Sequence, residues 1–260
     1  MSMSAPRFYV PQLAQVTSGF LDGAEARHAT SVLRLNADDQ VTLFDGLGAE
    51  ALARIVSTGR SQLAFEVLER IDRNRELVQP LTLAIALPKG DRQRTLIDAA
   101  TELGVTHFIP LRTHRGVAQP TDNALERLGR NVIEASKQCG RNRLMHIGAP
   151  QSVTELIGSQ PDGGCLRLVA HPYDEAGPRA PLRRLLARPV RAATIAIGPE
   201  GGFTSDEVQQ LTRQHWQAID LGPTILRVEI AAISAIAQLA AWLQPDASEP
   251  ASESSSIGKV

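Results

Sequence analysis

The chain has the length and composition of a soluble globular protein with room for two domains. It contains 260 residues, of which 43% are hydrophobic and 21% are charged, and its formal net charge is −1. Its apolar runs are too short to span a bilayer, its first residues lack the features of a signal peptide, and its overall charge does not mark it as a nucleic-acid binder. Its two cysteines lack a CxxC spacing, which argues against a disulfide framework or a zinc site. We therefore expect a cytoplasmic protein without a membrane partner or a bound metal.

Residues 1–75 predict a small β-rich domain. Four short segments are typical of strands, namely residues 7–10, 40–44, 51–57 and 62–68. Strands this short and closely spaced indicate a small barrel. Asp22 and Glu25 form a capping-box pattern, which predicts a helix over residues 24–34. The charged residues 69–79 favour a linker to a second domain.

Residues 76–245 predict an α/β domain, because strands and helices alternate and so favour a parallel sheet with helices on both faces. The expected strands cover residues 81–87, 106–110, 165–170, 193–197 and 218–221. The expected helices cover residues 91–103, 122–139, 181–187, 205–213 and 229–243. We expect Asp91 to cap the first helix, and Thr121 or Asp122 to open the second. Thr204 and Glu207 form a capping-box pattern, which predicts that the helix ending near Arg213 begins there.

The C-terminal part of the chain has two further features. The last expected helix, residues 229–243, is apolar nearly all round, so it is either deeply buried or part of a subunit interface. Residues 246–260 are rich in Ser, Glu and Pro, which predicts a disordered tail.

A glycine-rich turn connects the fourth strand of this domain, which ends at Ile197, to the helix that follows it. The turn reads Gly198, Pro199, Glu200, Gly201 and Gly202. Such turns at the carboxyl ends of parallel strands are where ligands bind. A phosphate is a poor ligand here, because Pro199 lacks an N–H donor and Glu200 adds a negative charge. A nucleoside with a positive charge, such as S-adenosylmethionine, fits better, and the alternative is a tight turn that binds nothing.

A second turn of the same kind follows the next strand. Its residues are Leu221, Gly222, Pro223, Thr224, Ile225, Leu226 and Arg227, with Glu229 at the head of the last helix. Two such turns on successive strands are expected to face one pocket. Arg227 stands at a helix N-terminus, against the helix dipole, and such local conflicts are more common at functional sites than elsewhere.

Together with these turns, several shorter motifs resemble the RsmE family of 16S rRNA (uracil-N3) methyltransferases, within the SPOUT class. The motifs are residues 6–10, His28 with residues 32–35, residues 43–46, 87–90 and 102–105, and Glu134-Ala135 with residues 138–141. The chain departs from the family pattern at Val228 and Ile230, where the family has threonines, at Met145, where it has proline, and at Asp38, where it has glycine.

The resemblance implies a fold, a cofactor and partners. The fold would be a PUA-like β-barrel followed by a SPOUT-type parallel sheet with a trefoil knot. The partners would be 16S rRNA in the small ribosomal subunit and a second copy of the chain, packed knot against knot. The cofactor would be S-adenosylmethionine, held by Ala170, His171, Pro172, Ile197, Gly198, Pro199, Gly201, Gly202, Leu221, Gly222, Pro223, Ile225 and Leu226.

The same resemblance gives hypotheses for the chemistry. Uracil N3 must lose a proton, so Arg227 or Arg141 would stabilise the resulting anion. Glu229 or Glu200 would accept that proton or position the cofactor, and the alternative is that Arg227 and Glu229 form only a helix-end ion pair. The RNA-binding surface would combine Lys89, Arg92, Arg94, Arg112, Arg115, Lys137, Gln138, Arg141 and Arg143.

Two other functions are compatible with the sequence. A methyltransferase of this class can act on another RNA or on a ribose 2′-hydroxyl. A non-catalytic RNA-binding assembly factor would explain the departures at Val228 and Ile230.

Overall fold

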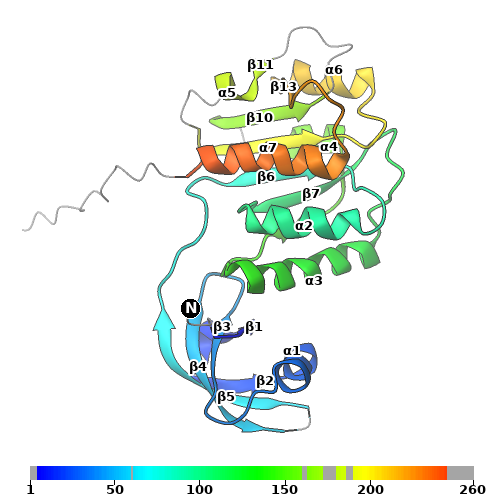
Figure 1. The fold of residues 1–260 in the computed structure, drawn as a ribbon. Helices are drawn as coiled ribbons and strands as arrows, with labels where there is room; N and C mark the ends of the chain where they lie inside the picture. The colour runs from blue at the N-terminus through cyan, green and yellow to red at the C-terminus, as the bar shows by residue number, and fades with distance from the viewer. Residues whose placement is uncertain (1–4, 60, 160–162, 172–179, 186–189, 245–260) are drawn as a thin grey trace, which may run out of the picture.

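The computed structural model describes residues 5–59, 61–159, 163–171, 180–185 and 190–244. Figure 1 shows two bodies, a bent sheet near the N-terminus and a larger layered α/β body that carries the last helix. The expected tail at 246–260 and the expected cofactor residue Pro172 lie outside the described residues.

The first body is a five-stranded sheet. Its strands are β1 (Arg7–Tyr9), β2 (Ser18–Leu21), β3 (Gln40–Phe44), β4 (Glu50–Thr58) and β5 (Leu63–Ile71), in the order β1-β3-β4-β5-β2. Two register shifts, which are typical of β-bulges, interrupt the pairing of β4 with β5, and such irregularities bend a sheet. The sheet encloses a core that includes Phe8, Leu43, Ile55 and Phe65.

Two details differ from the sequence prediction. Strand β2 was not expected, because it is short and contains Gly19. A side chain at Gly19 would begin 2.9 Å from the ring of Phe65, so glycine is required by packing. Residues 69–71 of the expected linker extend β5 instead.

The helix expected at residues 24–34 is shorter and changes type. After a short 3-10 turn, η1 (Leu13–Gln15), and β2, helix α1 (Gly23–Arg27) continues into the π-helical turn η2 (His28–Val32). The chain then leaves the helix at Arg34, which has a φ of 55°. The predicted capping box is wrong, because the Glu25 carboxylate binds Lys137 instead of the helix N-terminus.

The second body contains a sheet in the order β11-β13-β10-β12-β6-β7-β8, with β9 paired to β7, and all these pairs are parallel. Its strands are β6 (Leu81–Ile85), β7 (His107–Arg112), β8 (His146–Ile147), β9 (Gln151–Ser152), β10 (Cys165–Ala170), β11 (Ala180–Pro181), β12 (Ala192–Ile197) and β13 (Gln217–Asp220). The predicted parallel α/β sheet is confirmed. The two-residue strands were not expected, since they carry no periodic pattern. The trefoil knot stays a prediction, because strand order does not define how the loops thread.

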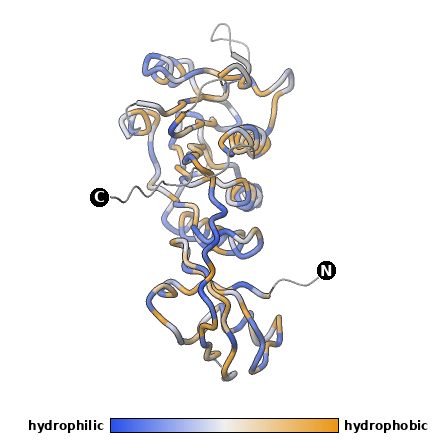
Figure 2. Tube along the Cα trace, turned by 90° about the vertical axis from the view of Figure 1, so that its left-hand side faces the viewer, coloured by the Kyte–Doolittle hydropathy of each residue, from blue (hydrophilic) through white to orange (hydrophobic). Residues whose placement is uncertain are grey.

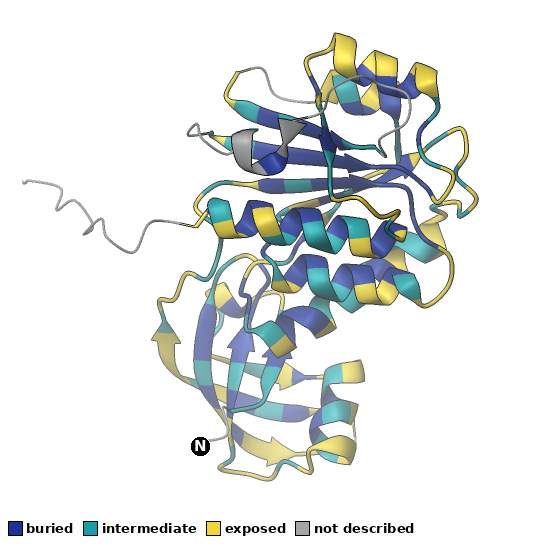
Figure 3. Ribbon diagram, turned by 45° about the horizontal axis from the view of Figure 1, so that its top comes forward, coloured by how far each residue is buried: buried dark blue, intermediate teal, exposed yellow. Residues whose placement is uncertain are grey.

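Helices cover both faces of this sheet. They are α2 (Arg92–Glu102), α3 (Asp122–Cys139), α4 (Val153–Ser159), α5 (Leu182–Leu185), α6 (Ser205–Arg213) and α7 (Val228–Trp242). Apolar residues of α2, α3 and α7 form one core with one face of the sheet, whereas α4 and α6 pack on the other face. In Figure 3 the central strands β6, β10 and β12 are mostly buried, and the helices expose their outer sides.

The helix ends test the capping predictions. Thr121 caps α3 by accepting a hydrogen bond from the backbone of Ala124, and Gly140 ends that helix with a φ of 81°. The capping box of Thr204 and Glu207 is confirmed at α6. The cap predicted at Asp91 is wrong, since its backbone is already helical, whereas an N-cap residue is normally extended.

Helix α7 is buried on one side only. Ala232, Ala235, Ile236 and Leu239 are inaccessible to solvent, whereas Ile230 is 45% exposed. The helix therefore packs its inner side on the sheet and on α2 and leaves an outer side with apolar groups.

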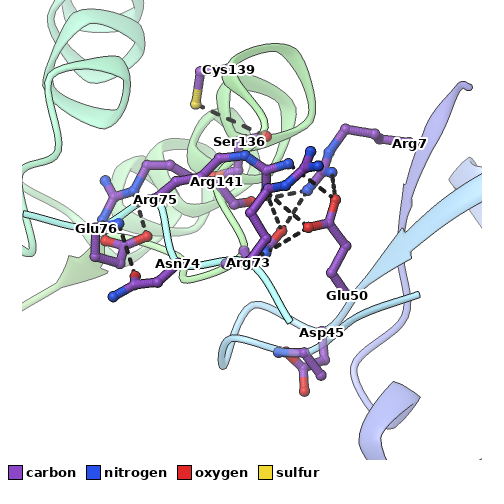
Figure 4. A network of polar contacts seen from close by, with 12 residues as sticks. Arg7, Asp45, Glu50, Arg73, Asn74, Arg75, Glu76, Ser136, Cys139 and Arg141 are labelled. Atoms are coloured by element: carbon purple, nitrogen blue, oxygen red, sulfur yellow. Dashed lines mark hydrogen bonds and ion pairs between the residues drawn. The ribbon is translucent and has the colours of Figure 1, made fainter. Parts of the chain in front are cut away.

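Hydrophilic residues gather where the two bodies meet (Figure 2). Glu50 of β4, whose side chain is 3% exposed, accepts hydrogen bonds from Arg7 at 2.5 Å, Arg75 at 2.9 Å and Asn142 at 2.9 Å. Figure 4 shows Arg7 and Arg75 converging on Glu50. The joint between the bodies is thus built from buried charges that bind one another.

Candidate functional site

The three loops expected to bind a cofactor begin at one edge of the sheet. Strand β10 lies between β12 and β13, and Ala170 pairs with Ile197 on one side and Ile219 on the other. All three strands are parallel, so their carboxyl ends lie at the same level. The backbone N–H of His171 donates to the carbonyl of Ile219 at 3.3 Å and continues this pairing. The two proline turns therefore leave the sheet about 10 Å apart, one strand on either side of β10.

The first turn is closed by its own backbone. The N–H of Gly202 donates to the carbonyl of Pro199 at 2.8 Å, and Gly202 has a φ of 69°, which favours glycine. A Cβ atom at Gly198 would lie 3.0 Å from the backbone nitrogen of Phe203. Phe203 itself is 1% exposed and anchors the end of the turn. Glycine at 198 and 202 is thus required by this compact shape.

The loop that follows β7 is hydrogen-bonded to the first turn and to the first residues of α6. The Glu207 carboxylate accepts hydrogen bonds from the backbone of Thr204 at 2.7 Å and of His114 at 2.9 Å. Arg115 donates to the carbonyl of Gly201 at 2.8 Å. The first turn is therefore fixed to β7 as well as to α6.

The second turn is more open. The N–H of Gly222 donates to the Asp220 side chain at 3.0 Å, and Gly222 has a φ of 133°. Ile225 is 89% exposed, and Arg227 is also exposed at the start of α7. Glu229, only 5% exposed, has Arg92 rather than Arg227 as its ion-pair partner among the residues described, with a separation of 3.6 Å. The alternative of an Arg227–Glu229 ion pair is therefore wrong for this structure.

Arg92 also contacts the first turn. Its Nη2 atom lies 3.1 Å from Glu200, and its Nε donates to the carbonyl of Lys89 at 3.3 Å. We had expected Arg92 to contact RNA, and the bridge between the two turns was not predicted. The available signal was an arginine in the first turn of α2, where it opposes the helix dipole.

The expected RNA-binding residues fall into two groups. The exposed ones are Lys89, Arg94, Arg112, Arg115, Gln138 and Arg143. Among them, Arg94 lies 3.6 Å from Asp98 and Arg112 is paired with Glu155 at 2.9 Å. Hydrogen bonds lower the pKa of the Glu155 carboxyl to about 2. The largest effect comes from the Ser152 backbone, followed by the Ser152 side chain and Arg112. Arg112 therefore faces a carboxylate that stays ionised at neutral pH.

Lys137 and Arg141 require a correction. Lys137 is 8% exposed and binds Glu25 and Glu134. Arg141 is 4% exposed, pairs with Glu76 at 2.5 Å, and donates to the carbonyls of Thr101 and Val105. Because both side chains are buried and bound to protein partners, they have a structural role at the joint. The predictions that Lys137 and Arg141 contact RNA, and that Arg141 donates to uracil, therefore do not fit this structure.

The loop backbones are open to their surroundings at two glycines. A Cβ atom built at Gly202 or at Gly222 would meet nothing within 4 Å, so the main chain there is accessible from outside. Main-chain N–H and C=O groups at such places can hydrogen-bond an adenosyl group, and the site therefore fits the cofactor implied by the resemblance. Across the described residues, no cluster of three His, Cys, Asp or Glu side chains is arranged to hold a metal ion. None of the helices described has the length and apolar character needed to cross a bilayer.

Comparison with known proteins defines the class first. A family model described as an RNA methyltransferase domain matches residues 75–240, and one described as an RNA methyltransferase PUA domain matches residues 21–68. The class is thus that of RNA methyltransferases with a PUA domain.

Individual relatives narrow the class to a family. The ribosomal RNA small subunit methyltransferase E of Rickettsia conorii is 35% identical, over 82% of this chain and 84% of its own. The solved structure of that enzyme from Neisseria gonorrhoeae, bound to S-adenosyl methionine, has a TM-score of 0.80 and 30% identity, covering 90% of this chain and 96% of its own. A Legionella pneumophila methyltransferase in complex with S-adenosylmethionine has a TM-score of 0.83 and 28% identity, with coverage of 92% and 98%. The chain belongs to the ribosomal RNA small subunit methyltransferase E family, as the sequence motifs predicted.

Proposed function

We propose that the chain transfers a methyl group from S-adenosylmethionine to N3 of a uridine in 16S rRNA. One observation carries this proposal: two Gly-Pro turns lie on either side of β10 at one sheet edge. Relatives of 28% and 30% identity, with the same overall fold, were solved with this cofactor bound.

The loop residues would hold the cofactor mainly through their backbone. They are Ala170, His171, Ile197, Gly198, Pro199, Gly201, Gly202, Leu221, Gly222, Pro223, Ile225 and Leu226, with Pro172 beyond the described part. S-adenosylmethionine supplies a methyl group already activated by its sulfonium charge. The main task of the loops is therefore alignment, which can lower a barrier by about 7–11 kcal/mol.

Arg227 is the better candidate for stabilising the uracil anion. It is exposed beside the second turn, and its guanidinium can donate to O2 or O4 as N3 loses its proton. Glu229 or Glu200 would accept that proton or position the reactants. A general base contributes about 10²–10⁴-fold to a rate, so losing it would leave a slow but measurable reaction.

RNA would bind across the exposed basic residues and the first body. Lys89, Arg112, Arg115, Gln138 and Arg143 are exposed, whereas the buried Lys137 and Arg141 leave the proposed surface. Phosphate contacts of this kind make affinity fall steeply as salt rises. We further propose that the substrate is the assembled small ribosomal subunit, that the enzyme acts in the cytoplasm, and that two copies pair through the outer side of α7.

Mapping of modified nucleotides tests the proposed reaction. Ribosomal RNA from cells lacking the gene should lose one N3-methyluridine of 16S rRNA, and the purified protein with S-adenosylmethionine should restore it. If the cells instead lose a 2′-O-methyl group, the target is a ribose 2′-hydroxyl. If they lose a modification in another RNA, that RNA is the substrate. Unchanged rRNA, together with no calorimetric binding of S-adenosylmethionine, would favour the non-catalytic assembly factor.

A further inference from the structure

One guanidinium joins three segments at the proposed active site. Arg92 donates through Nε to the carbonyl of Lys89, in the loop after β6, at 3.3 Å. Its Nη2 lies 3.1 Å from Glu200 in the turn after β12, and its Nη1 lies 3.6 Å from Glu229 at the head of α7. Each nitrogen of one planar group thus faces a different segment: the loop after β6, the turn after β12 and the first turn of α7.

The position of Arg92 is not explained by the stability of its own helix. It occupies the first residue of α2, where a positive charge opposes the helix dipole. The side chain is 36% exposed, so solvent reaches it and burial does not hold it in place. The contacts across the loops are therefore what fix its conformation.

Glu229 supplies the second, independent observation. It is 5% exposed, and its Oε2 atom is buried without a hydrogen-bond partner in the described structure. The Arg92 guanidinium, at 3.6 Å, is its ion-pair partner among the described residues. A buried carboxylate depends strongly on such a counter-charge, so removing Arg92 would leave Glu229 in an unfavourable site and free the second turn to move.

We propose that Arg92 is a positioning residue that sets the spacing of the two proline turns for methyl transfer, and this inference rests on the proposed function. Because the Arg92 guanidinium is planar and binds both Glu200 and Glu229, it keeps the first turn at a fixed distance from the first residues of α7. Arginine suits this role because its donors are fixed in one plane, whereas lysine offers a single point charge.

The test compares Arg92→Ala and Arg92→Lys with the control Arg130→Ala. Arg130 lies on α3, is 69% exposed and pairs only loosely with Glu126, at 4.0 Å. Four quantities are measured: kcat for methylation, KM for rRNA, the calorimetric Kd for S-adenosylmethionine, and hydrogen exchange of residues 198–203 and 221–229 without ligand.

For Arg92→Ala we expect kcat to fall by about 10- to 100-fold, because small misplacements of reactants have effects of that size. KM for rRNA should change little, and exchange should rise in both loops. Arg92→Lys should recover part of kcat, and Arg130→Ala should match the wild type throughout. If Arg92→Ala fails to fold, Arg92→Lys and Glu229→Gln give the same comparison, with exchange rising in residues 221–229.

The outcomes separate this inference from the proposed function. A wild-type protein that methylates no rRNA refutes the proposed function, and with it the role in methyl transfer, whatever the exchange shows. An active wild type with unchanged kcat and unchanged exchange in Arg92→Ala overturns the positioning role alone. A raised KM for rRNA with unchanged kcat also overturns it, because Arg92 would then serve as an RNA contact.

Discussion

Two buried glutamates, one at the joint between the two bodies and one where the loops leave the carboxyl ends of the strands (the loop edge), differ in their hydrogen bonding. At the joint, Glu50 receives hydrogen bonds from Arg7, Arg75 and Asn142. At the loop edge, Glu229 is equally buried, but its Oε2 accepts no hydrogen bond from the described residues. A carboxylate whose two oxygens both accept hydrogen bonds, as in Glu50, is held in place, whereas one with a free oxygen retains capacity for another partner. The difference teaches that hydrogen bonding, more than burial, distinguishes Glu50 of the joint from Glu229, which we propose acts in the reaction.

Removing Glu50 should break the joint and have the largest effect on stability. Glu50→Ala leaves two partly buried arginines without their shared carboxylate, which should lower the free energy of unfolding by about 3–5 kcal/mol. Urea unfolding measures the change. The matched control is Glu66→Ala, since Glu66 pairs with Arg54 but is 52% exposed, and its loss should cost no more than about 1 kcal/mol. Equal effects of the two substitutions would contradict a buried structural network.

Two nearby arginines sharpen the contrast between structure and binding. Arg141→Ala removes the partner of Glu76 and should destabilise the protein by about 3 kcal/mol. Arg143→Ala, at an exposed position, should leave stability unchanged, weaken RNA binding and reduce the salt slope of log K by about 1. Urea unfolding and salt-dependent RNA titrations measure these effects. Should Arg143→Ala leave the salt slope intact, Arg143 does not contact phosphate.

Local features of the fold were predictable from the sequence, and the joint was not. The capping box of Thr204 and Glu207 lies within four residues and was predicted correctly. Lys137 and Arg141, by contrast, bind carboxylates 112 and 65 residues away, and a basic cluster has the same sequence pattern whether it faces RNA or carboxylates. The loops of the candidate site could be identified from the sequence, because a Gly-Pro turn after a strand is a local signal. The bridge made by Arg92 depends on the strand order and could not be predicted.

Substitution by alanine should have opposite effects at two glycines of the second body, one in the first turn and one on a helix surface. Gly198→Ala places a Cβ atom 3.0 Å from a backbone nitrogen, so the first turn must shift. We expect a loss of about 1–3 kcal/mol in stability and about tenfold or more in affinity for S-adenosylmethionine. Gly129→Ala, within α3 and in open space, should instead stabilise by about 0.5–1 kcal/mol. Calorimetric titration and urea unfolding measure both variants, and undiminished cofactor affinity in Gly198→Ala would exclude this turn from the site.

Acidification should loosen the joint by a smaller amount. Burial raises the pKa of Glu50, but hydrogen bonds from Arg75, Asn142 and Arg7 outweigh it and hold that pKa below its usual value of 4.5. The unfolded chain therefore binds this proton first, and the stabilisation is complete above pH 4.5 and lost as the pH falls through the folded pKa. The stability gap between the wild type and Glu50→Gln should narrow across this acidic range. A gap that stays constant in urea unfolding from neutral to acidic pH would contradict this assignment.

The cofactor site at the loop edge is tested most directly by hydrogen exchange with and without S-adenosylmethionine. We predict that the ligand slows exchange in residues 197–203 and 219–228 and at His171, with little change at the joint. Protection confined to the first body, or no protection in these three segments at saturating ligand, would contradict the central claim that the loops after β10, β12 and β13 form the binding site.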